Sequence, residues 1–233
     1  MLGWTEILLI LIAIFILFYF RKSLGMEAVS PKEETQLAKS VLESLAVRPE
    51  TDRRINQIFK RLTKGLSLKF PHYELHRIDS HEINAMAIIG GNLLTTEGLI
   101  NLKNTSDDEL AGVLAHEIAH VELGHSRDAY YRENRTKLVK TAISILGRRT
   151  GSAAQVVERL AKLRVSRESE LEADNHAIQL LSRSQYSPSG LLKFLERAKE
   201  SDQAPEWGTF LSTHPSLDER IRHLKRRMSK TNG

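Results

Sequence analysis

Two histidines and a glutamate in the segment AHEIAHVELGH stand at the spacing that a metal-dependent hydrolase requires. His116 and His120 are four residues apart, so a helix places both imidazoles on one face, where each can reach the same ion about 2 Å away. Glu117 follows the first histidine and is placed to accept a proton from a water that the ion activates. This HExxH motif predicts a zinc hydrolase; the alternative is an ordinary solvent-exposed patch of His and Glu.

Zinc needs a further protein ligand, and the adjacent sequence does not supply it. His125 lies nine residues after His116, which is the opposite side of a continuous helix. Leu123 and Ser126 stand where metzincins have glycine and histidine. The remaining common arrangement, that of the gluzincins, takes a glutamate from a later helix. The segment SRESELEADNHA offers three, of which at most one can face the metal: Glu168, Glu170 and Glu172.

The spacing of these glutamates favours Glu170 without excluding the other two. Asp174 lies one helical turn after Glu170, so one member of this pair can bind the ion while the other steadies a ligand histidine. The residues alone therefore leave the choice of the third ligand open.

Helices and a few strands are predicted to position these residues. Ser106–Arg127 is predicted to be an amphipathic helix, because a serine cap and three acidic residues begin it. Residues 69–96 alternate in polarity and predict three short strands, with a turn at Gly90–Gly91. The other predicted helices cover residues 30–45, 49–66, 96–102, 130–182 with a break near 147–151, 187–200 and 215–228.

The amino terminus is predicted to be a membrane anchor. Ile7–Phe20 is a run of fourteen apolar residues, and counting from Trp4 gives a helix of roughly 25 Å, near the minimum for crossing a bilayer. No cation precedes the run, and two cations follow it where a small-residue cleavage site should begin, which disfavours the alternative of a signal peptide. The alternative of a buried soluble helix is disfavoured because a helix that is apolar all round rarely finds cover at a chain end. Arg21 and Lys22 after the run place the remaining chain in the cytoplasm by the positive-inside rule, with a periplasmic location as the alternative.

The composition permits one folded domain behind that anchor. The 233 residues are 41% hydrophobic and 27% charged, which is typical of a chain with a packed core. The absence of cysteine excludes disulfide scaffolds, thiolate metal sites and cysteine nucleophiles. We therefore divide the chain into an anchor (1–22), a juxtamembrane linker with an amphipathic helix (23–48) and a catalytic domain (49–233).

Four segments, in this order, carry a resemblance to a known family: INAMAIIGG, HEIAHVELGH, SRESELEAD and STHPSLDERI. Over residues 50–228 the chain resembles the zinc metalloprotease (gluzincin) family of HtpX, the CAAX prenyl endoprotease, BepA and LoiP. Its layout is most similar to that of the single-domain BepA- and LoiP-like members. The resemblance implies a zincin-like, predominantly helical α+β domain with a small sheet beside the active-site helix. It also implies one Zn²⁺ per chain, with Glu170 as the third ligand and Asp174 as its auxiliary.

The same resemblance implies how substrates bind. The family has a strand beside the cleft to which an extended substrate adds, and the matching residues here are Asn84, Ala85, Met86 and Ala87. The implied activity is that of a metalloendopeptidase that cleaves misfolded or membrane-associated proteins in protein quality control. The expected partners are therefore protein or peptide substrates and the lipid bilayer, and no nucleic acid.

His214 has two interpretations. It precedes Pro215, the first residue of the last predicted helix, so its position alone makes it a surface cap residue. The resemblance implies instead that it approaches the zinc from a mobile loop. Bound to the ion it would keep the protease latent, whereas swung away it would hydrogen-bond the developing oxyanion.

Two other functional classes are compatible with parts of the sequence. A chaperone-like scaffold without proteolytic activity would hold extended chains in the same cleft. A membrane-surface or nucleic-acid binder would use basic clusters, although such charge runs usually form solvated helix faces and no nucleic-acid motif accompanies them. The clusters comprise Arg148, Arg149, Arg159, Lys162 and Arg164, and then Arg220, Arg222, Lys225, Arg226 and Arg227.

Overall fold

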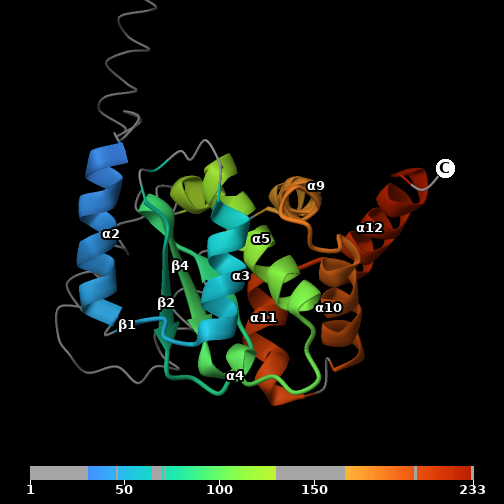
Figure 1. Ribbon diagram of the computed structural model, residues 1–233, viewed down its shortest axis with the longest axis horizontal. Helices are drawn as coiled ribbons and strands as arrows, with labels where there is room; N and C mark the ends of the chain where they lie inside the picture. Colours follow the sequence, from blue (N-terminus) through green and yellow to red (C-terminus); the bar gives the residue numbers. More distant parts are fainter. Residues whose placement is uncertain are drawn as a thin grey trace, which may run out of the picture.

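One small sheet lies among a larger set of helices (Figure 1). The computed structural model describes residues 31–45, 47–64, 70, 72–129, 166–201 and 204–231. The first elements are α2 (Pro31–Leu45), β1 (Arg48–Pro49), α3 (Arg53–Thr63), β2 (Glu74–Ile78), β3 (Ala85–Ala87), the 3₁₀ turn η1 (Ile89–Gly91) and β4 (Asn92–Thr96). After them come α4 (Glu97–Ile100), α5 (Asp107–Leu123), α9 (Arg167–Arg183), α10 (Ser189–Glu200), η2 (Pro205–Trp207), α11 (Gly208–Thr213) and α12 (Leu217–Thr231).

The strand order places β3 at an edge of the sheet. The strands lie in the order β1-β2-β4-β3; β2 and β4 are parallel, and the other two pairs are antiparallel. Gly90 and Gly91 turn the chain between β3 and β4, with φ angles of 74° and 84° in the left-handed region that glycine tolerates. Within the described part of the chain, β3 therefore has a strand partner on one side only.

The helix α5, which carries the HExxH motif, lies between the sheet and the helices α9 and α10 (Figure 1). Its start is fixed by a capping box, in which Ser106 and Glu109 each accept a hydrogen bond from the backbone N–H of the other. Gly112 allows α10 to approach closely, because a Cβ at this position would lie 2.5 Å from the backbone nitrogen of Leu191. Gly124 ends the helix in the left-handed conformation, with φ of 80°. The helix is thus held at both ends and in its middle.

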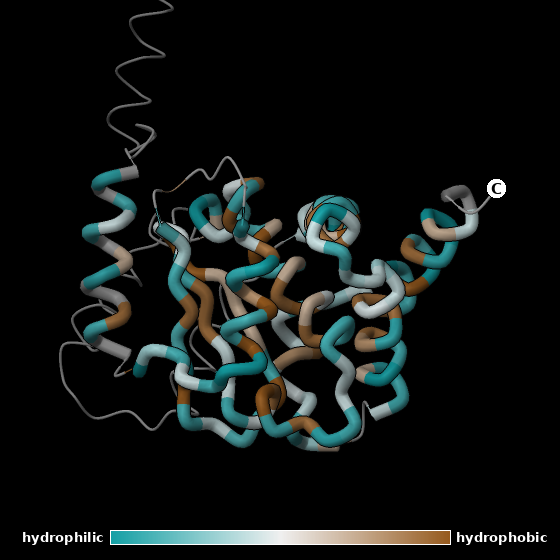
Figure 2. Tube along the Cα trace, viewed as in Figure 1, coloured by the Kyte–Doolittle hydropathy of each residue, from teal (hydrophilic) through white to brown (hydrophobic). Residues whose placement is uncertain are grey.

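The hydrophobic core lies on both sides of α5. Figure 2 shows hydrophobic residues concentrated in the middle of the molecule. Leu110, Leu114 and Ile118 of α5 are almost completely buried, and each such side chain contributes about 1.5–3 kcal/mol to folding. The helices α3, α9 and α10 cover them with Ile55, Ile58, Leu62, Leu180, Leu181, Phe194 and Leu195.

The mainly helical fold with one small mixed sheet agrees with the predicted α+β class. The three strands predicted within residues 69–96 are confirmed as β2, β3 and β4. A fourth strand, β1, was not predicted; its residues Arg48 and Pro49 pair with β2. The helix expected from Pro49 begins at Arg53 instead, since the Asp52 side chain accepts from the Ile55 N–H and caps it there. The last helix, which was predicted to begin at Pro215, begins at Leu217.

Some predicted segments lie outside the described residues. These are the anchor and the first part of the linker (residues 1–30), and residues 130–165 with their basic cluster. The described part of the long predicted helix is α9, which begins after a Ser166 cap. Among the residues that the structure describes, no helix is both long enough and apolar enough to span a membrane.

Candidate metal centre

The helix α5 brings the HExxH residues together in the interior. His116, Glu117 and His120 are each at most 3% exposed. The Nε2 atoms of His116 and His120 lie 3.0 Å apart. The spacing of one helical turn thus directs both Nε2 atoms towards one point, as the sequence predicted.

The helix α9 adds two buried carboxylates. The oxygens of Glu170 lie 3.3 Å from His116 Nε2 and 3.3 Å from His120 Nε2. Asp174 lies behind the first histidine, with its Oδ1 atom 3.0 Å from His116 Nδ1. One carboxylate therefore faces the two Nε2 atoms while the other contacts the far side of a histidine ring, which is the arrangement that spacing and resemblance had suggested for this pair.

His214 closes the cluster from the short segment between α11 and α12. It is 4% exposed, so it is not the surface cap that its place before Pro215 suggested. Its Nε2 atom lies 3.5 Å from Glu117 Oε1, and its Nδ1 atom lies 3.4 Å from Glu170 Oε2. The ring of Phe210 lies 4.9 Å from the imidazole, centroid to centroid, and covers it.

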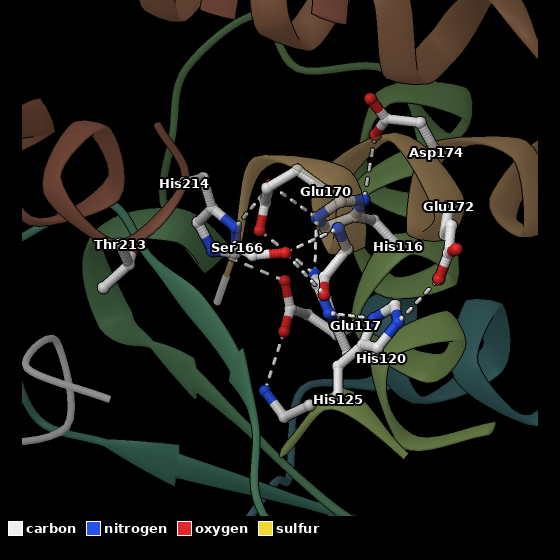
Figure 3. A network of polar contacts seen from close by, with 12 residues as sticks. His116, Glu117, His120, His125, Ser166, Glu170, Glu172, Asp174, Thr213 and His214 are labelled. Carbon is white, nitrogen blue, oxygen red and sulfur yellow. Dashed lines mark hydrogen bonds and ion pairs between the residues drawn. The ribbon is translucent and has the colours of Figure 1, made fainter. Parts of the chain in front are cut away.

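Four side chains therefore meet in a group of the size that a metal ion requires (Figure 3): His116, His120, Glu170 and His214. One ligand atom from each lies within 4.8 Å of all the others. In the described part of the chain, neither oxygen of Glu170 and neither ring nitrogen of His214 makes a well-directed hydrogen bond, although all are buried. Buried polar atoms without well-directed hydrogen bonds are costly, and a metal ion among them would satisfy them. The donor set fits a metal such as zinc.

A buried arginine stands behind the two carboxylates of α9. The Nη1 atom of Arg220 lies 2.7 Å from Glu170 Oε2. Its Nε and Nη2 atoms donate hydrogen bonds to the two oxygens of Asp174, at 2.9 and 2.6 Å. The guanidinium thereby compensates negative charge that would otherwise be buried alone.

The charge run had predicted a solvated helix face for Arg220, and that interpretation is wrong. The side chain is 1% exposed, whereas Arg222 and Lys225 of the same run are exposed. Its helical position explains the difference, because Leu217 and Leu224, three residues before and four after, pack against the core on the same face of α12. In the sequence, the spacing of the apolar residues indicates which face of α12 is buried, whereas the charges do not.

Glu117 is held against the edge strand β3. The Ala87 N–H donates to Glu117 Oε2 at 2.7 Å, whereas Glu117 Oε1 has no hydrogen-bond partner among the described residues. Backbone hydrogen bonds join Asn84 and Ile88 to β4, so the alternate residues Ala85 and Ala87 direct their backbone groups the other way, towards α5. The strand β3, which the resemblance implied as the substrate-binding strand, therefore lies beside the four-residue group.

Burial and charge separate the pKa values of the two α5 histidines. Burial lowers the pKa of His120 to about 3, with a contribution from the neighbouring His116. Burial is also the largest influence on the pKa of His116 and lowers it, as does Arg220. The carboxylates of Glu170 and Asp174 together outweigh both and raise this pKa to about 9. In the metal-free protein at pH 7, His120 is therefore neutral and His116 carries a proton.

Glu117 and Glu170 also differ in basicity. Burial raises the pKa of Glu117, which suits a carboxylate that must accept a proton. Burial acts in the same direction on Glu170, but attraction to Arg220 and His214 holds its pKa well below the usual range. Glu170 thus stays an anion that can bind a cation.

The other two glutamates of the predicted trio point away from the four-residue group. Glu168 is exposed on α9. Glu172 Oε2 lies 3.2 Å from His125 Nε2. His125 is likewise outside the group, as its helical position predicted.

Known proteins resemble this chain over most of its length. Residues 49–228 match the model of Peptidase family M48. The metalloprotease LoiP of Escherichia coli K12 is 28% identical over 185 residues, which cover 77% of this chain and 71% of LoiP. The metalloprotease YcaL of the same organism is also 28% identical over 185 residues, covering 76% of this chain and 70% of YcaL. The beta-barrel assembly-enhancing protease of this strain is 29% identical over 198 residues, which cover 78% of this chain but 40% of that protein.

The family match and the geometry agree on the kind of chemistry. The relatives are named as proteases, two of them as metalloproteases, and the buried His/Glu group is placed to bind a metal. The resemblance found in the four sequence segments is thereby confirmed. The chain belongs to peptidase family M48 and is a metalloendopeptidase.

Proposed function

We propose that the metal is zinc, that His116, His120 and Glu170 hold it, and that Glu117 is the general base of peptide hydrolysis. One observation carries this proposal: two imidazole nitrogens and a buried carboxylate whose oxygens make no well-directed hydrogen bond converge on one point. Nitrogen and carboxylate ligands, with three from the protein, are the set that catalytic zinc sites of this type use. The low pKa of Glu170 supports its role as an anionic ligand.

The catalytic roles follow from the contacts of Glu117. Zinc at this point supplies Lewis-acid activation of water and of the peptide carbonyl. Glu117 takes a proton from the attacking water on Oε1, which is free of hydrogen bonds among the described residues, and passes it to the leaving amine. The Ala87 N–H holds the other oxygen, so the carboxylate keeps its orientation. Asp174 orients the ring of His116 through Nδ1.

The edge strand β3 is where we expect an extended substrate to bind. Asn84 and Met86 direct their backbone groups towards β4, and Ala85 and Ala87 direct theirs towards α5. A peptide that adds to this edge hydrogen-bonds with the backbone groups of Ala85 and with the carbonyl of Ala87, whose N–H is held by Glu117, and passes the four-residue group. Main-chain hydrogen bonds provide its affinity.

His214 acts as a latch in this proposal. Its ring nitrogens are buried beside Glu117 and Glu170, and it is one of the four residues that converge. With the metal bound, His214 would supply a fourth protein ligand and exclude the water needed for attack, so the enzyme would stay latent until the segment that carries His214 moves. The alternative is that His214 donates a hydrogen bond to the oxyanion during turnover.

The cellular role that we propose is membrane-anchored protein quality control. Residues 1–22 are the anchor, 23–48 the linker and 49–233 the catalytic domain, and the anchor holds the domain near misfolded or membrane-associated substrates. The apolar run Ile7–Phe20 supports the anchor, and the name of the beta-barrel assembly-enhancing protease supports membrane-associated substrates. The cations after the run support a cytoplasmic domain.

Metal analysis combined with casein digestion tests the core of this proposal. The purified full-length protein should contain about one zinc per chain, and chelation should abolish digestion until zinc is restored. Digestion that continues after complete metal removal would contradict it. If residues 1–22 are an anchor, the full-length protein should remain with membranes through high-salt and carbonate washes. Release by either wash would contradict the proposed anchor.

A further inference from the structure

Each of the two α5 histidines has a polar partner on the ring nitrogen that faces away from the four-residue group. For His116 this partner is Asp174, 3.0 Å from Nδ1. For His120 it is a third histidine, since the Nδ1 atoms of His120 and His125 lie 3.0 Å apart. His125 in turn has Glu172 Oε2 at 3.2 Å from its Nε2 atom (Figure 3). A series of three side chains in contact thus leads from the four-residue group to the surface: His120, His125 and Glu172.

The position of His125 depends on the end of α5. On a continuous helix a residue five positions after His120 would lie about 140° around the axis. Gly124 breaks the helix with φ of 80°, a conformation that favours glycine, and the chain turns at this point. His125 thereby comes back against His120 and is 8% exposed. The same α9 helix supplies Glu170 to the metal-binding group and Glu172 to His125.

The positions of the ring protons of His120 and His125 follow from the requirement that His120 can bind a metal. His120 presents Nε2 to the four-residue group, 3.3 Å from Glu170 Oε1, so metal binding requires the lone pair of Nε2. The ring proton of neutral His120 must then sit on Nδ1 and be donated to His125 Nδ1. His125 consequently accepts at Nδ1 and carries its own proton on Nε2, which donates to the carboxylate of Glu172. Every contact has one donor and one acceptor in this assignment.

We propose that His125, held by Glu172, is a positioning residue that fixes the tautomer and ring orientation of His120 and thereby strengthens metal binding. The inference rests on the proposed role of His120 as a metal ligand. One ring nitrogen of His125 contacts His120 Nδ1 and the other contacts Glu172, and His125 is not itself a member of the four-residue group, so it acts through His120. Partners of this kind typically change metal affinity 10- to 100-fold. Glu172 is 65% exposed, so its own effect lies at or below the lower end of that range.

The test compares zinc affinity, by competition with a chelator, in full-length variants. His125→Phe, which keeps a ring but no acceptor, should weaken zinc binding about 10- to 100-fold. His125→Asn keeps a neutral acceptor at the place of Nδ1 and should recover part of the affinity. Glu172→Gln should weaken binding by a smaller factor, and Glu168→Gln on the same helix is its matched control. In the His125→Asn background, Glu172→Gln should have no further effect.

A spectroscopic readout separates positioning from a general effect on folding. In cobalt-substituted protein, His125→Phe should change the ligand-field spectrum, and Glu168→Gln should not. Unchanged zinc affinity and an unchanged cobalt spectrum in folded His125→Phe would overturn the inference. Where His125→Phe does not fold, equal zinc affinities of Glu172→Gln and Glu168→Gln overturn it. Wild-type zinc affinity in His120→Ala would instead refute the ligand set of the proposed function.

Discussion

The guanidinium of Arg220 bridges the carboxylates of Glu170 and Asp174, so the anion that faces the metal-binding group is shared with a buried cation. Removal of this cation leaves the two buried carboxylates with only part of their compensating charge, that of the protonated His116. Such a loss costs about 3–5 kcal/mol of folding free energy.

Arg220→Met should therefore lower the unfolding free energy of the metal-free protein by about 3–5 kcal/mol. Zinc should restore part of the loss, because the ion brings positive charge to Glu170. Denaturant unfolding with and without zinc measures both effects. Arg222→Met, an exposed neighbour on α12, is the control and should stay within about 0.5 kcal/mol of the wild type. Equal stability of the two variants would contradict the bridging role.

Glu117→Gln should keep zinc and the fold but lower peptide hydrolysis by at least about 100-fold, the usual scale of general-base catalysis. The glutamine amide oxygen can still accept the Ala87 N–H, so the side chain keeps its place. Zinc content and kcat on a fluorogenic peptide are the measurements. Undiminished kcat in a zinc-loaded variant would remove Glu117 from the mechanism.

Glu170→Ala should lose zinc, whereas Glu168→Ala should retain it, because only the former side chain reaches the two imidazoles. Asp174→Ala should weaken zinc by about 10- to 100-fold, since Asp174 orients His116 without facing the ion. Chelator competition ranks the three variants. Stoichiometric zinc in Glu170→Ala at wild-type affinity is the result that would reject this ligand.

His214→Ala should raise basal proteolysis and leave zinc bound, because the latch no longer occupies the position that water needs. Steady-state kinetics of zinc-loaded protein test this expectation. A fall in kcat with KM nearly unchanged would show the oxyanion role instead, and wild-type kinetics would exclude both roles.

Zinc binding at pH 7 should release about one proton, because His116, with a pKa of about 9, is protonated in the metal-free protein. The apparent affinity should accordingly fall as the pH falls below 9, by about tenfold per pH unit. His120, with a pKa of about 3, is already neutral and releases nothing. Calorimetry in two buffers of different ionisation enthalpy counts the protons, and a count of zero would show that His116 is neutral before zinc arrives.

The helix with HExxH and its cap could be predicted from the sequence, because capping and the i, i+4 spacing act within one element. The choice of Glu170 required the family resemblance, since three glutamates in alternation differ only in how α9 is rotated against α5. Local rules also miss β1, because two residues form a strand only when β2 is present to pair with them.

The burial of Arg220 and the contact between His125 and His120 could not be predicted from the sequence alone. Arg220 sits in a run of cations, and its burial depends on which face α12 turns towards α9. His125 was correctly excluded from the four-residue group, yet its contact with His120 depends on the left-handed turn at Gly124. In both cases the decisive information is the contact between elements.

The edge of β3 presents main-chain groups of Ala85 and Ala87 beside the metal-binding group. Most strands of a native protein are already paired within their own sheets, whereas a chain that has lost its native structure offers many extended segments that can pair with such an edge. Under the proposed function, we expect an edge of this kind to select substrates by their conformation, so that the enzyme cleaves a damaged copy of a protein and spares an intact one of the same sequence.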